Sequence, residues 1–158
     1  MQALSELATK LRRTVLLGHS QAGRYPFEAA LLGRPGILAI VAIEPAGCNA
    51  SVYSKQQIAT LARTPILIAF GDHLAAPQPM GIKWNEAYDD CKEFVAKINA
   101  AGGKASMYHP ADQGIKGNSH MMMEDKNSLQ IADYIMRWNH ALDRSTDVPC
   151  RPMTPPKF

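Results

Sequence analysis

Short hydrophobic runs alternate along this chain with stretches in which apolar residues recur every three or four positions. The run Ile37–Ile43 is apolar throughout, which is typical of a parallel strand buried on both faces. Because such runs alternate with amphipathic helical stretches, the pattern predicts an α/β fold with a parallel sheet and right-handed crossovers. The expected strands are Thr14–Leu17, Ile37–Ile43, Pro65–Phe70 and Lys104–Tyr108.

Helical periodicity marks the stretches between and around these strands. The expected helices cover residues 1–12, Arg24–Leu32, 54–62, Asn85–Ala101 and 125–142. The face of the closing helix that is expected to pack on the core carries Leu129, Ala132, Ile135, Met136 and Leu142. A polar, glycine-containing loop from Pro110 to Ser119 leads to His120 just before that helix.

The length of 158 residues fits one domain with a sizeable core. We expect residues 1–145 to form this domain and the proline-rich residues 146–158 to be irregular. The net charge of +3 is small and its basic residues are scattered, which argues against a nucleic-acid partner. No apolar run approaches the roughly 20 residues of a membrane span, and residues 1–7 lack the basic start and apolar middle of a signal peptide.

Three cysteines, Cys48, Cys91 and Cys150, show no metal-binding spacing, and we expect no metal and no cofactor. The sequence leaves open whether Cys48 pairs with Cys91, pairs with Cys150, or stays reduced. The cellular compartment therefore stays open as well.

The stretch Thr14–Arg24 has the layout of a nucleophile elbow, in which a serine sits on a sharp turn between a strand and a helix. Such a turn needs little bulk two residues before and two residues after the serine, and Gly18 and Ala22 meet this need around Ser20. The alternative is an ordinary strand-to-helix turn with a capping serine.

In a parallel sheet, residues just past the carboxyl ends of neighbouring strands converge on one edge. Ser20, Glu44, Asp72 and the loop that carries His120 all leave the predicted sheet there. A serine needs a base in hydrogen-bond reach and a carboxylate to orient that base. His120 is the expected base, with His109 as its rival.

His19 is expected to point to the other side of the turn. Two carboxylates compete for the role of the acid. Glu44 ends an otherwise apolar strand, where a carboxylate is costly without a partner, and we prefer it to Asp72. The alternative role for Asp72 is to cap a loop.

Three segments together resemble one family, the cap-poor bacterial and fungal esterases of the α/β-hydrolase superfamily. They are Gly18–Phe27, Ile43–Pro45 and Gly114–His120. The family's elbow reads G-H-S-Q-S/A-G, and its triad acid is a glutamate after the sixth strand. The resemblance implies Ser20 as nucleophile, Glu44 as acid and His120 as base, with the backbone N–H of Gln21 in the oxyanion hole.

The resemblance also implies that the chain holds only part of the family's fold. The family has eight strands with the elbow after the fifth, so the expected sheet of about four strands corresponds to strands five to eight. The loop that gives the second oxyanion N–H then has no counterpart here, and the strand at Val15–Leu17 becomes an open edge that favours self-association or pairing with another chain.

The expected function is therefore hydrolysis of small-molecule carboxylic esters through an acyl-enzyme, impaired by the missing half. The alternatives are a thioesterase, acyltransferase or peptidase with the same triad, and an inactive half-domain that needs a complementary segment. The family resemblance is compatible with secretion or a periplasmic location of a longer form.

Overall fold

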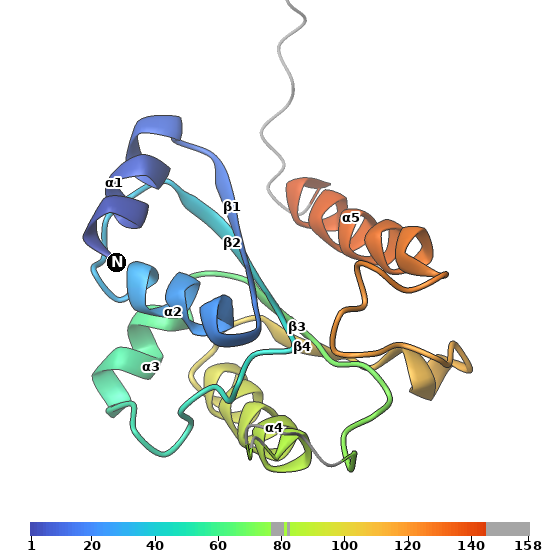
Figure 1. Ribbon diagram of the computed structural model, residues 1–158. Coiled ribbons are helices and arrows are strands. Elements are labelled where there is room, and N and C mark those ends of the chain that lie inside the picture. The colour runs from blue at the N-terminus through green and yellow to red at the C-terminus, as the bar shows by residue number, and fades with distance from the viewer. Residues whose placement is uncertain (77–80, 82, 145–158) are drawn as a thin grey trace, which may run out of the picture.

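A computed structural model describes residues 1–76, 81 and 83–144 of the chain (Figure 1). The expected irregular tail at 146–158 and Cys150 lie outside the described residues. In chain order the elements are α1 Gln2–Leu11, β1 Thr14–His19, the 3₁₀ turn η1 Ser20–Arg24, α2 Tyr25–Ala30, β2 Ile37–Ile43, α3 Lys55–Leu61, β3 Ile66–Ala69, α4 Trp84–Ala100, β4 Ala105–Tyr108, the 3₁₀ turn η2 Pro110–Gln113 and α5 Ser128–Arg144.

The four strands form one parallel sheet in the order β1-β2-β3-β4. Leu17 of β1 lies opposite Val41 of β2, and Val41 lies opposite Leu67 of β3. The predicted α/β class and the parallel sheet are thereby confirmed. Because all strands run in the same direction, the residues that follow β1, β2 and β3 gather at one edge, where the candidate site lies.

Helices cover the two faces of the sheet unequally, as Figure 1 shows. Ile40 and Ala42 of β2 belong to the core under α2, α3 and α4, while α1 packs through Ala8 on Leu16 of β1. Val41 and Ile43, which alternate with them, face α5 instead. Helices therefore lie on both faces of the sheet, with most of them on one side.

The expectation that Leu129 and Met136 of α5 point into the core is wrong. Leu129 is 80% exposed and Met136 50% exposed, and Ala132 is exposed as well. Among the described side chains of α5, Ile131 is the one buried against the sheet. Helical spacing identifies residues that share a face, but it does not reveal whether another element covers that face. Only part of the apolar surface of α5 has a partner among the described residues.

One free edge of the sheet lies at β1, as expected, since β1 pairs only with β2 among the described strands, and β4 is the edge strand at the other side. Leu17 of β1 is 57% exposed there. It borders a groove of about 360 Å³ between β1 and α5, whose apolar lining includes Ile43, Met122, Met123, Ile135 and Met136. We call this groove the open groove.

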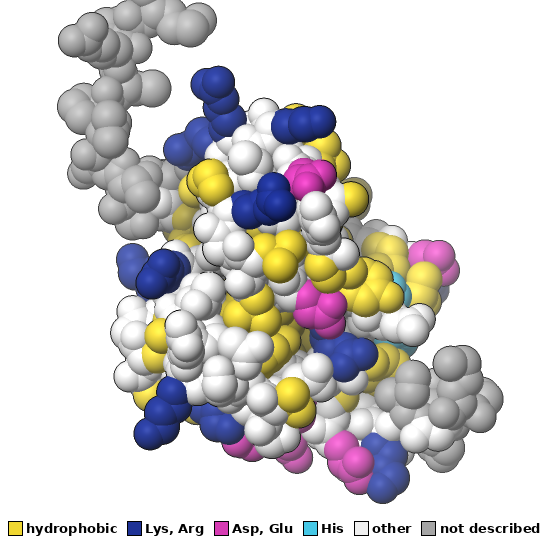
Figure 2. Space-filling view, turned by 90° about the vertical axis from the view of Figure 1, so that its left-hand side faces the viewer, with side chains coloured by type: hydrophobic (Ala, Val, Ile, Leu, Met, Phe, Trp, Pro, Cys, Tyr) yellow, Lys and Arg dark blue, Asp and Glu magenta, His cyan; other side chains and the backbone are white. Residues whose placement is uncertain are grey.

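The described surface shows no concentration of one charge on the face drawn in Figure 2, where Lys and Arg side chains are spread among polar and hydrophobic ones. No helix in the described part of the chain is long and apolar enough to cross a membrane.

Candidate active site

The turn from β1 into η1 holds Ser20 in a strained backbone conformation. Its φ is +56°, in the left-handed region that a residue with a side chain seldom adopts. A Cβ at Gly18 would lie 2.4 Å from the carbonyl oxygen of Ala22, and one at Gly23 would lie 2.8 Å from Cβ of Pro45. The turn therefore requires glycine at both places, and the serine side chain stands at the carboxyl edge of the sheet.

Three of the expected site residues lie in hydrogen-bond contact, although they are far apart in the sequence. Nε2 of His120 lies 2.9 Å from Oγ of Ser20, and Nδ1 of His120 lies 3.2 Å from Oε2 of Glu44. A neutral imidazole that donates a hydrogen bond from Nδ1 to the carboxylate has a free lone pair on Nε2. This lone pair can accept a hydrogen bond from the hydroxyl group of Ser20. The imidazole thus bridges the hydroxyl and the carboxylate.

Glu44 is almost completely buried, with 3% of its surface exposed. Its second carboxylate oxygen accepts a hydrogen bond from the backbone N–H of Gly71, just beyond β3. The carboxylate is therefore partnered on both oxygens, as a buried charge requires. Its backbone φ of +45°, directly after β2, lies in the left-handed region that residues with a side chain seldom adopt.

Asp72, the alternative acid, has a different set of partners. Its carboxylate accepts hydrogen bonds from the backbone N–H groups of Gly117, at 2.5 Å, and Asn118, at 3.3 Å. These contacts fix the loop that leads to His120. The geometry therefore favours the loop-capping role for Asp72 and the pairing of Glu44 with His120.

His109, the rival base, is occupied by other contacts. Its Nε2 lies 3.1 Å from the carbonyl oxygen of Gly71, and its Nδ1 lies 3.0 Å from Oδ1 of Asp112. The ring of Tyr88 lies against it at 5.5 Å between centroids. Burial raises the pKa of the Tyr88 phenol, and the nearby Asp112 raises it further, so this phenol stays protonated at neutral pH.

Two aromatic neighbours of His120 have contacts that the sequence did not predict. Contrary to expectation, His19 turns toward the site: its Nε2 lies 2.8 Å from the carbonyl oxygen of His120, and the two rings are 4.7 Å apart. The indole of Trp84 stacks on the imidazole of His120 with centroids 4.3 Å apart. Neither contact has a sequence signal, because each joins segments more than 30 residues apart.

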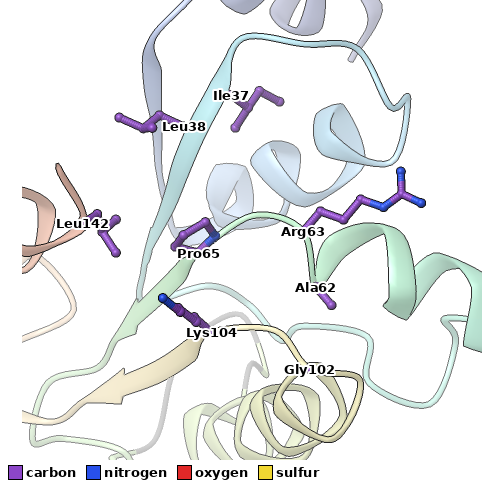
Figure 3. A pocket seen from close by; sticks show the side chains of 8 residues that line it. All are labelled: Ile37, Leu38, Ala62, Arg63, Pro65, Gly102, Lys104 and Leu142. Atoms are coloured by element: carbon purple, nitrogen blue, oxygen red, sulfur yellow. The ribbon is translucent and has the colours of Figure 1, made fainter. Parts of the chain in front are cut away.

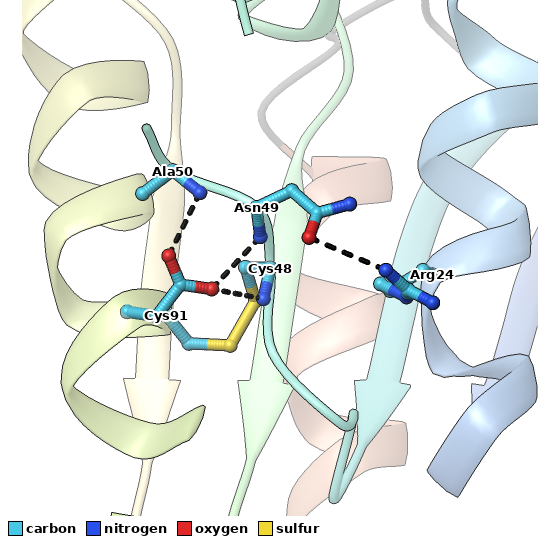
Figure 4. Close-up of a disulfide and its surroundings, with 6 residues drawn as sticks. Arg24, Cys48, Asn49, Ala50 and Cys91 are labelled. Atoms are coloured by element: carbon cyan, nitrogen blue, oxygen red, sulfur yellow. Dashed lines mark hydrogen bonds between the residues drawn. A yellow bond between two sulfur atoms is a disulfide. The ribbon is translucent and has the colours of Figure 1, made fainter. Parts of the chain in front are cut away.

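The loop that follows Glu44 is fastened to α4. Cys48 and Cys91 form a disulfide, which settles one of the pairings left open by the sequence. Next to it, the carboxylate of Asp90 accepts hydrogen bonds from three consecutive backbone N–H groups, those of Cys48, Asn49 and Ala50, at 2.6 to 2.9 Å (Figure 4). We call the disulfide and these hydrogen bonds the loop clamp.

A second cavity lies far from this constellation. It measures about 440 Å³ and is formed at the opposite end of the sheet, where Ile37 begins β2 and Pro65 precedes β3 (Figure 3). Within the described residues no group of His, Cys, Asp and Glu side chains could hold a metal ion.

Comparisons with known proteins identify esterases as structural relatives. The structure of a novel bacterial esterase matches 89% of this chain and 42% of its own, with 41% sequence identity and a TM-score of 0.78. Esterase PE8 is 18% identical over 85% of this chain and 56% of its own, with a TM-score of 0.52, which speaks for the fold alone. No family model matches the chain.

One curated sequence also matches. A fungal protein described as probable secreted lipase phiG, from Fungal sp. (strain ATCC 74256), is 42% identical over 41 residues, which make up 26% of this chain and 11% of that protein. The chain spans less than half the length of the bacterial esterase and a small part of the lipase. The predicted resemblance to α/β-hydrolase esterases is thereby confirmed, and the described sheet and helices form a partial α/β-hydrolase fold.

Proposed function

We propose that this chain carries the catalytic triad of a serine hydrolase acting on carboxylic esters, with Ser20 as nucleophile, His120 as base and Glu44 as acid. The observation that carries the proposal is the continuous pair of contacts through His120, at 2.9 Å to Ser20 and 3.2 Å to Glu44. The esterase and lipase names of the relatives support ester hydrolysis as the reaction.

In the proposed acylation step, Oγ of Ser20 attacks the ester carbonyl carbon while its proton passes to Nε2 of His120. The electron pair of the C=O bond moves to the carbonyl oxygen, which becomes an oxyanion. Collapse of this intermediate breaks the bond to the alkoxy group, and His120 returns the proton to the leaving oxygen. The products are an alcohol and an acyl group bound to Ser20.

In the proposed deacylation step, a water molecule gives a proton to Nε2 of His120 while its oxygen attacks the acyl carbon. The bond between the acyl carbon and Oγ of Ser20 then breaks, His120 returns the proton to Oγ, and a carboxylic acid leaves. Glu44 orients the imidazole and stabilises its cationic form in both steps. The backbone N–H of Gln21 is the proposed oxyanion donor, since it belongs to the residue after the nucleophile. Because loss of one such donor costs about 10²- to 10³-fold in rate, we expect a low rate if the chain lacks a second donor.

The alternative to ester hydrolysis is a thioesterase, acyltransferase or peptidase reaction with the same triad. A thioester, an amide, or an acyl acceptor other than water would use the same three residues, and the choice among them depends on the walls of a substrate pocket. We favour carboxylic esters as the substrates because esterase and lipase are the activities in the names of the relatives.

The test is turnover of p-nitrophenyl acetate and p-nitrophenyl butyrate by residues 1–158, with Ser20→Ala as the matched control. Both proteins are also treated with a fluorophosphonate probe, which reacts quickly only with an activated serine. We expect turnover and labelling in the wild type and neither in Ser20→Ala. Equal rates for the two proteins, when both are folded by circular dichroism, would overturn the proposal.

A second candidate function follows from the free edge at β1 and the open groove beside it. In this alternative the chain is an inactive half-domain that becomes competent only when a complementary segment, or a second copy, pairs near Val15–Leu17. A folded chain whose Ser20 resists the fluorophosphonate probe would favour this alternative over the enzyme.

A further inference from the structure

We propose that Trp84 stabilises the protonated imidazole of His120 through the face of its indole ring, which makes Trp84 a positioning residue for the proposed triad. The inference rests on the proposed function for its catalytic meaning. Its physical content, a preference of the indole for the charged over the neutral imidazole, is measurable without any turnover.

The geometry at Trp84 is that of a stacked pair. The two ring planes are inclined by 30° and their centroids are 4.3 Å apart. Trp84 begins α4 and is only 4% exposed, so its ring is held by the core under that helix. A cation within about 6 Å of an indole face is attracted by the negative potential of the ring.

This contact acts differently on the two states of His120. When His120 takes the proton from Ser20, its ring becomes a cation that lies on the indole face. The neutral imidazole before the transfer gains much less from the same ring. An interaction that is stronger in the charged state lowers the barrier to proton transfer, because it favours the transition state over the ground state.

Several other groups surround His120, and all of them stay in place when only the indole changes. Glu44 faces its Nδ1, and His19, from β1, is a second imidazole ring beside it. Lys83, the residue before α4, and Glu86 in its first turn form an exposed ion pair next to Trp84 in the sequence. In the loops around it, Asp125 binds Ser119 and Asp72 binds Gly117 and Asn118.

The experiment replaces tryptophan by mono-, di- and trifluorinated tryptophan in the full 158-residue chain. Fluorine withdraws electron density from the ring face and leaves its shape nearly unchanged, so packing and burial are preserved. The pH titration of the His120 ring signal is followed by NMR, with assignment by His120→Gln and His19→Gln variants. His140, which is exposed near the end of α5, is the internal reference.

We expect the titration midpoint of His120 to move to lower pH with each added fluorine, and the signal of His140 to stay in place. Complete loss of the interaction corresponds to about 0.4 to 1.5 pH units. The sign follows because a weaker face stabilises the protonated ring less, so the proton leaves at lower pH. The chain's other tryptophan, Trp138, is fluorinated at the same time, so its effect needs a control. In a Trp84→Phe variant only Trp138 carries fluorine, and the titration midpoint of His120 should then not respond to fluorination.

If the chain hydrolyses esters, the fluorinated tryptophan series should also lower kcat/KM by about 2- to 30-fold overall and leave KM unchanged. The acid limb of the pH profile of kcat/KM should move to lower pH, as the titration midpoint of His120 does. A midpoint that stays constant through the fluorine series would overturn the inference, whether or not the chain is an esterase. A shifted midpoint without Ser20-dependent turnover would keep the inference and overturn the proposed function instead.

Discussion

The carboxyl edge of the sheet and its free edge at β1 differ in how completely their surfaces are matched. At the carboxyl edge, both oxygens of Glu44 and both ring nitrogens of His120 have partners, and the flanking loops are fixed by Asp72 and the loop clamp. At the free edge, Leu17 is exposed beside the open groove. The comparison teaches that Glu44 and His120 are fully hydrogen-bonded at the carboxyl edge, whereas the hydrophobic surface at β1 is only partly covered by the described residues.

Substitution at the carboxyl edge should have the largest effect. Glu44→Gln keeps the shape of the side chain, but its amide turns a donor or a neutral oxygen toward Nδ1 of His120 in place of a charged acceptor. We expect esterase turnover to fall by about 10⁴-fold, as for the loss of a triad carboxylate elsewhere, in a p-nitrophenyl butyrate assay. Asp72→Asn is the control and should keep most of the activity; the reverse ranking would show that Asp72 is the acid.

The next largest effect is expected on stability, where a substitution in the buried core should cost far more than one on the exposed surface of α5. Phe94 of α4 is fully buried with its ring against Phe27 of α2, so Phe94→Ala should lower the free energy of unfolding by about 3 to 5 kcal/mol through lost burial and a cavity. Leu129→Ala on α5 should change it by less than about 0.5 kcal/mol, since that side chain is already in solvent. Urea unfolding measures both, and equal losses would mean that Leu129 is covered in solution.

The loop clamp should contribute somewhat less than the large core residue. The disulfide joins residues 43 positions apart, so Cys48→Ser should cost about 2 to 4 kcal/mol, chiefly by freeing the unfolded chain. Urea unfolding with and without a reductant provides the measurement. Reductant should destabilise the wild type and leave Cys48→Ser unaffected, and a wild type that is indifferent to reductant would contradict the bridge.

A substitution at the free edge of β1 should have the smallest effect on stability, but it should change the association between copies of the chain. Leu17→Lys places a charge on an exposed edge strand, which opposes pairing between chains, and should change the free energy of unfolding by less than about 0.5 kcal/mol. In sedimentation velocity the wild type should gain mass with concentration and the variant should not. Leu129→Lys, outside the groove lining, is the matched control, and a monomeric wild type would refute the role of this edge.

The sequence alone determined the order of the strands and helices. Runs such as Ile37–Ile43 are apolar on both faces and alternate with amphipathic helical stretches, which is typical of a parallel sheet covered by helices on both sides. It also identified Ser20, Glu44 and His120 as candidates, because residues that follow parallel strands must meet at one edge. Local pattern was sufficient for these conclusions because each depends on periodicity and on the carboxyl-edge rule.

Only the tertiary structure decided the contacts between distant segments. The stacking of Trp84 on His120, the turn of His19 toward the site and the pairing of Cys48 with Cys91 have no local signature, because they join parts of the chain that periodicity treats separately. The exposure of Leu129 and Met136 is of the same kind. The sequence of a helix identifies its apolar face, but the burial of that face depends on which other elements of the fold pack against it.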